Sequence, residues 1–270
     1  MRVRWIAAAL VAALCLSLAA CGHPTVSRDP NAGLPTLTIG GDDYKPYIYL
    51  DDQGNFTGID VELATEACRR LGYRPVFRQI AWEKKDEELA LGNVDCLWGS
   101  FTMTGREDRY QWAGPYLFSR QVVVVRADSD IDTLADLAGK RVAVQATSKP
   151  ETIFLERPEP ERVPQVGEVY CFSTMEEAYS AIRKDFVDAI AGHEQAMKLF
   201  AEESPGTWRV LEEELMLSAL GVAFLKGTNE SLSRQLAVVL QEMQEDGTTV
   251  RILEKYGLDA EQVLRERGNS

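Results

Sequence analysis

Hydroxyl and guanidinium groups follow one another in a single loop of this chain. Ser100, Thr102 and Thr104 occupy alternate positions, so on an extended backbone their hydroxyls would share one face. Thr104 and Glu107 have the spacing of a capping box, which predicts a helix start with free backbone amides near Arg106. Arginine can bind a carboxylate through two parallel hydrogen bonds. The loop is therefore a candidate carboxylate site, although Arg106 could instead be a surface residue paired with the acids beside it.

A second loop, residues 145–151, also suits an anion. Ser148 and Glu151 repeat the capping-box spacing, and Pro150 would stand in the first helical turn, where its missing N–H is harmless. The start of a helix presents free N–H groups and the positive end of the helix dipole to an anion. A capped helix without any ligand would show the same pattern.

Aromatic side chains accompany these polar loops. Tyr44 follows Gly41, Asp42 and Asp43 in a loop where glycine would let the backbone approach a ligand. The aromatic ring offers a flat apolar face, and the carboxylates could bind a cation. Trp82 lies between a predicted strand and a predicted helix, where it could stack over a ligand or belong to the core.

The elements that must position these loops alternate between strand and helix. Apolar periodicity and turn signals predict strands at residues 37–39, 47–50, 76–77, 96–98, 121–126, 141–145, 169–172, 187–191 and 221–225. They predict helices at residues 83–91, 134–137, 150–155, 175–183, 230–246 and 249–256, and one that Asp60 caps and Gly72 ends. Such alternation implies parallel strands with crossovers, and hence two α/β units. Because ligands of these sheets bind outside the carboxyl ends of the strands, we expect the polar loops to meet in a cleft between the units.

The first 35 residues differ from the rest. Arg2 and Arg4 precede an almost wholly apolar run over residues 5–20, which is typical of a secretory signal. We therefore interpret residues 1–20 as a signal peptide and residues 21–35, which have little apolar content, as a flexible tether. No later stretch is long and apolar enough to span a membrane, so the remainder is expected to be soluble.

Cysteines give a second indication of the compartment. Residues 18–21, Leu-Ala-Ala-Cys, resemble a bacterial lipobox, in which Cys21 is acylated and becomes the first mature residue. Cys68 would lie on the apolar face of a helix and Cys96 in a strand, so buried thiols are expected, although the two could pair in an oxidising compartment. With Cys171 the mature chain has three further cysteines, an odd number that cannot all pair internally.

Several motifs, in order along the chain, resemble the bacterial family 3 extracellular solute-binding proteins, which are receptors of polar amino-acid ABC importers. The motifs occupy residues 43–47, 58–64, 92–95, 102–106, 114–116, 139–145, 187–190, 246–248 and 255–257. Each is loose alone, but their order and spacing together are specific. The resemblance extends from about residue 36 to residue 258.

The resemblance implies an α/β, two-lobed periplasmic-binding-protein type II fold. Each lobe would be a mixed sheet flanked by helices, and a hinge of two crossing strands would join the lobes. Lobe 1 would comprise residues 36–117 and 220–270, and lobe 2 residues 118–219, with the hinge near residues 117–120 and 217–220. Closure about such a hinge around a ligand is a common binding motion.

The resemblance also implies ligand contacts, position by position. They are, in chain order, Tyr44, Trp82, Ser100, Thr102, Arg106, Thr147, Ser148 and Lys149. The first two match an aromatic pair that sandwiches the ligand, and the next two a pair that contacts its ammonium and carboxylate groups. Arg106 matches the arginine that binds the α-carboxylate, and the last three residues match a loop that closes on it from lobe 2. The segment before Arg106 is one residue shorter than the common pattern, so Arg109 could take its place.

One position departs from the family pattern. After the strand predicted at residues 187–191, the family usually has an aspartate that holds the ligand's α-ammonium group, whereas this chain has His193 followed by Glu194. Either Glu194, Asp42 or Asp43 binds the ammonium group, or the ligand lacks one. His193 could also be an ordinary surface residue.

The function implied is that of an extracytoplasmic substrate-binding lipoprotein of an ABC importer, which captures a small amino-acid-like ligand. The expected partners are this ligand, the permease subunits of the importer, and the cell membrane through an acyl group such as palmitate on Cys21. A monomer is expected. The formal charge of −13, or −15 without Arg2 and Arg4, argues against binding to nucleic acid.

Two other functions use the same fold. One is a dehydratase-like periplasmic enzyme, in which Glu194 beside His193 could act as a general acid or base. The other is a ligand-sensing receptor that signals through a separate protein. His23 and His193 are the two histidines, and the chain contains no phosphate loop, dinucleotide fingerprint or Gly-x-Ser-x-Gly elbow. We therefore expect no intrinsic catalysis, no cofactor and no metal site.

Overall fold

One mixed sheet of eight strands organises the computed structural model, which describes residues 33–264. The strand order is β4-β1-β5-β10-β6-β9-β7-β8, and β2 and β3 form a separate small hairpin. The predicted signal peptide, Cys21 and most of the predicted tether lie outside the described residues.

The bounds of the elements are as follows. The strands are β1 (Thr36–Gly41), β2 (Tyr49–Leu50), β3 (Phe56–Thr57), β4 (Arg74–Gln79), β5 (Cys96–Leu97), β6 (Tyr110–Arg126), β7 (Arg141–Gln145), β8 (Glu168–Phe172), β9 (Ala189–His193) and β10 (Trp208–Leu225). The helices are α2 (Ile59–Leu71), α3 (Lys85–Ala90), α4 (Lys149–Glu156), α5 (Met175–Arg183), α6 (Glu194–Glu202), α7 (Glu230–Glu245), α8 (Thr248–Lys255) and α9 (Ala260–Leu264). Two short 3-10 helices are η1 (Trp82–Lys84) and η2 (Leu134–Leu137).

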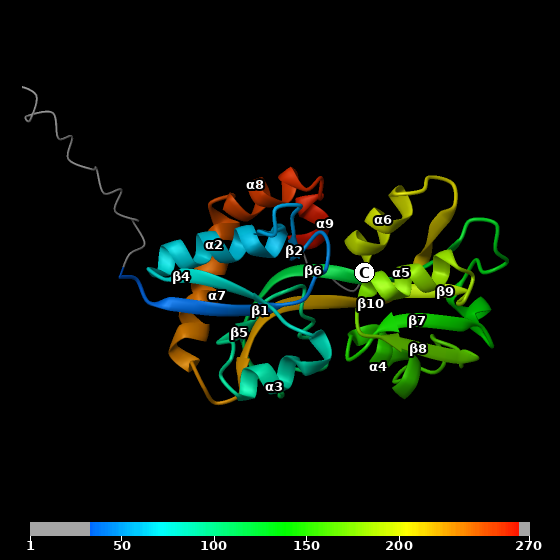
Figure 1. Cartoon of the computed structure of the whole chain (residues 1–270), viewed down its shortest axis with the longest axis horizontal. Coiled ribbons are helices and arrows are strands. Elements are labelled where there is room, and N and C mark those ends of the chain that lie inside the picture. The colour runs from blue at the N-terminus through cyan, green and yellow to red at the C-terminus, as the bar shows by residue number, and fades with distance from the viewer. Residues whose placement is uncertain (1–32, 265–270) are drawn as a thin grey trace, which may run out of the picture. The chain divides into compact units, whose positions relative to one another are not determined.

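The sheet has two halves that share a pair of long strands. In the first half β4, β1 and β5 are parallel, and in the second half β9, β7 and β8 are parallel. Between them β6 and β10 pair antiparallel and run from one half into the other (Figure 1). Where the halves meet, Leu117 of β6 is opposite Leu220 of β10, and Arg120 is opposite Leu217.

β6 and β10 are much longer than the sequence predicts. The predicted strands covered only residues 121–126 and 221–225, because Gly114, Pro115 and Gly221 are typical of strand ends. In the structure both strands continue past these residues, and the ladder is shifted in register near Gly221. Pairing with the partner strand therefore extends each strand beyond what its own sequence indicates.

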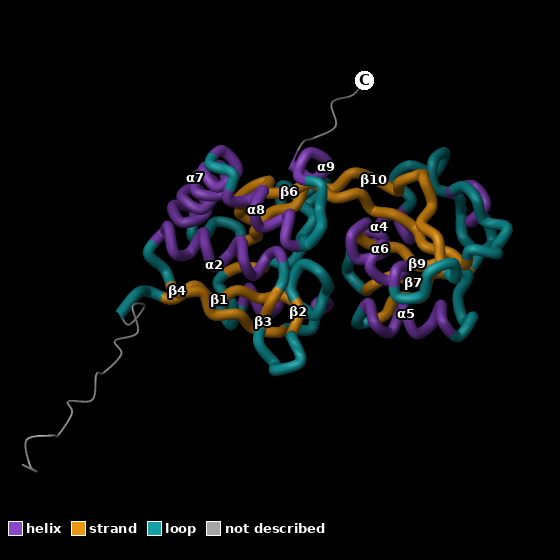
Figure 2. The backbone as a smooth tube through the Cα atoms, turned by 90° about the horizontal axis from the view of Figure 1, so that it is seen from above, coloured by secondary structure: helices purple, strands orange, loops and turns teal. Residues whose placement is uncertain are grey.

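Helices cover the sheet and bury both of its faces. Figure 2 shows α2, α7 and α8 beside the first half, and α4, α5 and α6 beside the second. In β6 the side chains of Val122 and Val124 belong to one apolar cluster, and those of Val123 and Val125 to another on the opposite face. Each fully buried side chain of this kind stabilises the fold by about 1.5 to 3 kcal/mol. Continuous burial on both faces explains the uninterrupted valine run.

Two further expectations concern the burial of the cysteines and the absence of membrane-spanning segments. Cys68 and Cys96 are buried free thiols, as expected, while the free thiol of Cys171 is exposed. Among residues 33–264, no helix combines the length and apolar character that a membrane crossing requires.

The prediction that Asp60 caps α2 is wrong. Gly58 is the N-cap residue, with a φ of 121°, and Asp60 lies fully buried in the first turn. Its Oδ2 accepts a hydrogen bond of 2.6 Å from the backbone N–H of Ser100, while Oδ1 has no partner among the described residues. Burial raises the pKa of Asp60 to about 7. The carboxyl group thus fixes the position of the loop after β5 instead of the helix end.

We predict that Asp60 makes stability depend on pH. An unfolded aspartate loses its proton near pH 4, whereas folded Asp60 keeps it until about pH 7. In the interval the folded state binds more protons, so the free energy of unfolding should fall as the pH rises, by about 1.4 kcal/mol for each pH unit. Asp60→Asn retains an acceptor for the Ser100 N–H and removes this titration.

Urea unfolding of the original protein and Asp60→Asn, at several pH values between about 4 and 8, measures the difference. Contributions from other titrating groups cancel between the two proteins. A difference in the free energy of unfolding that stays constant with pH would contradict the raised pKa.

Candidate functional site

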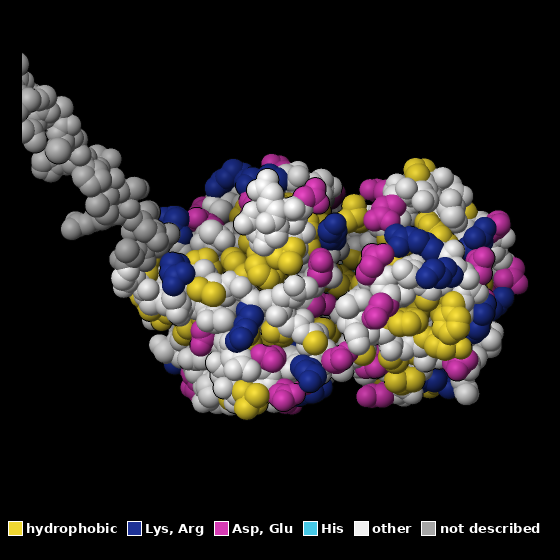
Figure 3. All heavy atoms as spheres, viewed as in Figure 1, with side chains coloured by type: hydrophobic (Ala, Val, Ile, Leu, Met, Phe, Trp, Pro, Cys, Tyr) yellow, Lys and Arg dark blue, Asp and Glu magenta, His cyan; other side chains and the backbone are white. Residues whose placement is uncertain are grey.

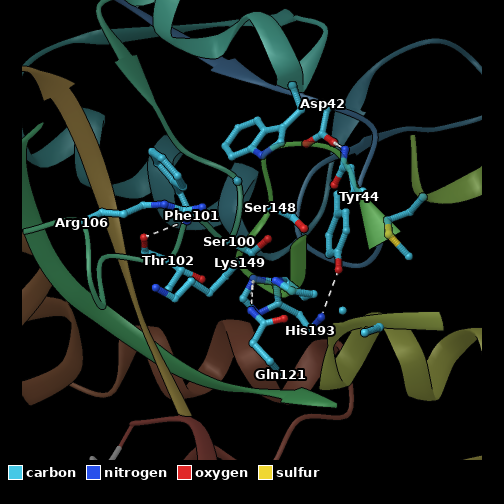
Figure 4. A pocket seen from close by; sticks show the side chains of 17 residues that line it. Asp42, Tyr44, Ser100, Phe101, Thr102, Arg106, Gln121, Ser148, Lys149 and His193 are labelled. Carbon is cyan, nitrogen blue, oxygen red and sulfur yellow. Dashed lines mark hydrogen bonds between the residues drawn. The ribbon is translucent and has the colours of Figure 1, made fainter. Parts of the chain in front are cut away.

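A cavity lies where the carboxyl ends of the parallel strands of both halves meet. Its volume is about 410 Å³, including the part open to solvent. Loops that follow β1, β4, β5 and β7 line it, together with the end of β9, as the expectation of a cleft requires. Among the predicted contacts, those in the lining are Tyr44, Trp82, Ser100, Thr102, Arg106, Ser148, Lys149 and His193 (Figure 4).

The loop after β1 is held against the end of β9. The Tyr44 hydroxyl accepts a hydrogen bond of 3.1 Å from the backbone N–H of His193. A Cβ atom on Gly192 would lie only 2.8 Å from the Tyr44 oxygen, so this contact needs glycine at that position. Tyr44 therefore links the two halves of the sheet at one side of the cavity.

Trp82 serves both the cavity and the core, the two roles that the sequence left open. Its ring packs edge-on against Phe101, with the centroids 5.0 Å apart, and the residue is buried. Phe101 also lies beneath the Arg106 guanidinium, at 5.3 Å. The two aromatic rings thus form an apolar wall, and the Arg106 guanidinium lies over one of them.

The helix start predicted from Thr104 and Glu107 does not form. These residues lie in turns, where the Thr104 hydroxyl accepts a hydrogen bond of 3.0 Å from Ala219 N–H and Glu107 Oε1 accepts one from Gly105 N–H. The alternating hydroxyls do not share one face either, because Ser100 has a left-handed φ of 47°. Contact with β10 overrides the local capping pattern.

Arg106, and not Arg109, reaches the cavity. Arg106 is 7% exposed, and its guanidinium donates to the carbonyl oxygens of Thr102 at 3.4 Å and Thr147 at 3.1 Å. No carboxylate of residues 33–264 forms an ion pair with it, and burial lowers its pKa. Arg109 has a largely exposed side chain that is paired with Asp86. The free donors of Arg106 are available to a ligand.

The start of α4 forms as predicted at the other side of the cavity. The Ser148 hydroxyl caps the helix by accepting from Glu151 N–H at 3.4 Å. The Glu151 carboxylate accepts from Thr147 N–H, one residue before the expected position, at 2.7 Å. Thr147, which has a left-handed φ of 59°, precedes these residues but is not part of the lining, contrary to the prediction. Lys149 is the first residue of the helix and lines the cavity.

Lys85 lies outside the lining but contacts residues at the cavity, and the sequence analysis missed it. It is 3% exposed, and its ammonium group donates to the Thr147 hydroxyl at 2.8 Å and lies 5.4 Å from the centre of the Trp82 ring. Burial lowers its pKa to about 8. In the sequence Lys85 stands in a run of charged residues, which resembles a solvated helix face.

His193 is buried and uncharged. It ends β9 and lies at the N-cap position of α6, and burial lowers its pKa to about 3. The amide nitrogen of Gln121 is 3.1 Å from its ring nitrogens and also donates to Ser218 at 3.2 Å. The oxygen of the same amide is buried and has no partner among the described residues. The alternative of a surface histidine is wrong.

Among the acids considered for an ammonium group, Asp42 alone lines the cavity. It is buried, accepts a hydrogen bond of 2.5 Å from the Gln145 amide, and burial raises its pKa to about 6. Asp43 is exposed. The carboxylate of Glu194 lies outside the lining and pairs with Arg120 at 3.1 Å and Lys198 at 2.9 Å.

Comparisons with known proteins agree with this geometry. The L-cystine-binding protein TcyA of Bacillus subtilis is 30% identical over 224 residues, which are 82% of this chain and 80% of TcyA. An ancestral arginine-binding protein bound to arginine has a TM-score of 0.74 and 27% identity, over 82% of this chain and 97% of that one. An ancestral amino-acid-binding protein, a precursor of cyclohexadienyl dehydratase, has a TM-score of 0.72 and 26% identity, over 82% and 95%.

One family model matches most of the chain. The model named bacterial extracellular solute-binding proteins, family 3, matches residues 37–259, nearly all of the described chain. The mixed α/β sheet is that of the type II amino-acid-binding proteins among the solved structures. The family match shows that the chain belongs to the bacterial extracellular solute-binding proteins, family 3, and the cavity agrees with that membership.

Proposed function

We propose that this protein is an extracytoplasmic receptor that binds a small amino-acid-like ligand and delivers it to the permease subunits of an ABC importer. The observation that carries the proposal is Arg106, a buried guanidinium with no carboxylate partner among the described residues, at a cavity lined from both halves of the sheet. A buried cation of this kind is stable only when an anion or several hydrogen bonds satisfy it. A ligand carboxylate supplies that partner.

In this proposal the halves of the sheet are two lobes that close on the ligand. Lobe 1 comprises residues 36–117 and 220–270, and lobe 2 residues 118–219. β6 and β10 form the hinge. Four hydrogen bonds that join the two halves support closure, namely His193 to Tyr44, Gln145 to Asp42, Lys85 to Thr147 and Arg106 to Thr147. All four involve residues around the cavity, so opening the hinge would break them together.

The ligand's carboxylate would lie between Arg106 and the start of α4. Arg106 would bind it with its free N–H donors, and Lys149 at the N-terminal end of α4 would face it from lobe 2. Tyr44 and Trp82 would cover the ligand's flanks, and Ser100 and Thr102 would offer hydroxyl groups. The residue contacts are therefore divided between the lobes, and each lobe alone would bind weakly.

Attachment to the membrane is also part of the proposal. Residues 18–21, which resemble a lipobox, support this: an acyl group such as palmitate would be attached to Cys21 after removal of a signal peptide. The protein would then act as a lipid-anchored monomer on the extracytoplasmic face of the cell membrane. A tether over residues 21–35 would let the binding lobes reach the permease.

Arg106→Ala tests the carboxylate contact. We expect it to weaken ligand binding by about 2 kcal/mol or more, roughly 30-fold in Kd, because a charge-assisted pair in a closed site is lost. Isothermal titration calorimetry measures Kd with whichever of L-cystine, L-arginine and L-glutamate binds most tightly. Arg109→Ala is the matched control and should change Kd less than about threefold, since the pair with Asp86 is exposed. Loss of affinity in Arg109→Ala but not in Arg106→Ala would contradict the assignment.

A dehydratase-like enzyme is the second candidate, favoured by the raised pKa of Asp42 within the cavity and by the likeness to the precursor of cyclohexadienyl dehydratase. A receptor should gain melting temperature when a ligand binds, because a ligand of the native state stabilises it by mass action. It should also leave prephenate and arogenate unchanged in a chromatographic assay. Consumption of either compound, lost in Asp42→Asn, would favour the enzyme.

A further inference from the structure

Positive charge gathers at one end of the cavity without acidic partners. Arg106 and Lys149 both line this end, and neither forms an ion pair within residues 33–264. A Cβ atom added to Gly105 would lie 2.7 Å from the Lys149 ammonium group, so Lys149 rests against the backbone directly beside Arg106. Desolvation, and then the charge of Arg106, lower the pKa of Lys149. Two cations held this close repel each other unless an anion lies between them.

The described acids around this end form no ion pair with either cation. Glu107 does lie beside Lys149, because its carboxylate accepts from the N–H of Gly105, against which the Lys149 ammonium group rests. Asp86 accepts a hydrogen bond from Tyr110 and pairs with Arg109. Glu107 accepts from its neighbouring backbone and is exposed, and Glu151 accepts from Thr147 N–H. None of the three lines the cavity. The start of α4, an eight-residue helix, adds its positive dipole end at the same place.

The part of the lining around His193 has few negatively charged groups that could bind a cation. Among the described residues, the polar side chains that form hydrogen bonds with His193 are Gln121 and Tyr44, both neutral, and Gln121 donates in turn to the neutral Ser218. Asp42 is the carboxylate of the described lining, and the Gln145 amide already occupies one of its oxygens. An ammonium group beside His193 would therefore be buried among neutral groups, at a high desolvation cost.

The positive charge at this end of the cavity contrasts with the net negative charge of the whole chain. The chain carries 42 acidic and 29 basic residues, and the face in Figure 3 shows acidic side chains on both sides of the seam between the halves of the sheet. The cavity instead places two unpaired cations against one carboxylate. A cavity more positive than its surroundings is suited to an anion.

We propose that the ligand is a small organic anion with net negative charge, one or two carboxylates not balanced by an ammonium group, and that Lys149 together with Arg106 selects for that charge. This inference rests on the proposed receptor function and specifies its ligand class. It distinguishes the cavity from that of a receptor for a cationic or zwitterionic amino acid. Lys149 acts as a second contact for the anion, from the lobe opposite Arg106.

A ladder of probes with similar skeletons and stepwise charge tests the proposal. Glutarate, L-glutamate, L-glutamine and L-arginine form one series, and succinate, L-aspartate and L-asparagine a shorter one. Titration calorimetry of the full chain at neutral pH should give the tightest binding for the anionic members of a series, at least tenfold tighter than for the neutral or cationic members. Added salt should weaken the anionic members most.

Lys149→Gln locates the effect, with Lys226→Gln as the matched control on an exposed lysine far along the chain. Lys149→Gln should raise the Kd of the best dicarboxylate at least tenfold and the Kd of L-glutamine less than threefold. The differences in Kd between the probes of a series should therefore become smaller. Lys226→Gln should leave every Kd unchanged. Unfolding curves of both variants confirm that they remain folded.

Each outcome has one meaning. Tightest binding of L-glutamine, L-asparagine or L-arginine overturns the inference and leaves the receptor function intact. An unchanged ladder in Lys149→Gln also overturns it, because the selecting charge would then lie elsewhere. Absence of binding by every probe and by L-cystine overturns the inference and the receptor function together.

Discussion

A guanidinium buried without a carboxylate is the constraint on which this site depends. Removing a cation from water costs several kcal/mol even after the surrounding protein relaxes. Two carbonyl oxygens offset part of that cost for Arg106, and one of them, that of Thr147, comes from the opposite half of the sheet. Burial of the charge is therefore complete only when the halves are together. In the proposed function, the same contact couples the energetics of anion binding to the geometry of β6 and β10.

Backbone strain at Ser100, which lines the cavity, and at Thr147, which precedes Ser148 of the lining, shows how tightly the loops are held. Ser100 and Thr147 both have left-handed φ values, which cost of order 1 kcal/mol or more for residues with a Cβ. Each is fixed through its own N–H, which donates to a buried or partly buried carboxylate, Asp60 for Ser100 and Glu151 for Thr147. The strained loops thus lie on opposite sides of the cavity, and each depends on an acid that does not line it.

The sequence predicted best those features whose signals are local. The bounds of α5 and β7 agree with the prediction, because a capping threonine and an apolar strand of fixed length define them. It failed where tertiary contacts decide. β6 and β10 extend because each is the partner of the other, and the Thr104 hydroxyl serves β10 instead of a helix. Lys85 and Gln121 carry no local mark of burial, so their places in the site could not be inferred. Position by position, comparison with the family pattern had singled out eight of the seventeen lining residues.

Features set by the topology of the sheet and features set by contacts between distant residues also have different roles in the proposed site. The first bind the ligand, and the second determine which ligand is accepted. Arg106 and the start of α4 lie where the carboxyl ends of strands from both halves meet, a place that the topology of the sheet itself creates. What else the cavity accepts depends on pairs such as Asp42 with Gln145 and His193 with Gln121, which join residues distant in sequence. Exchange of one such side chain changes the charge of the lining without moving a strand. Relatives with one fold can therefore differ in ligand, and the fold alone does not determine which ligand this cavity holds.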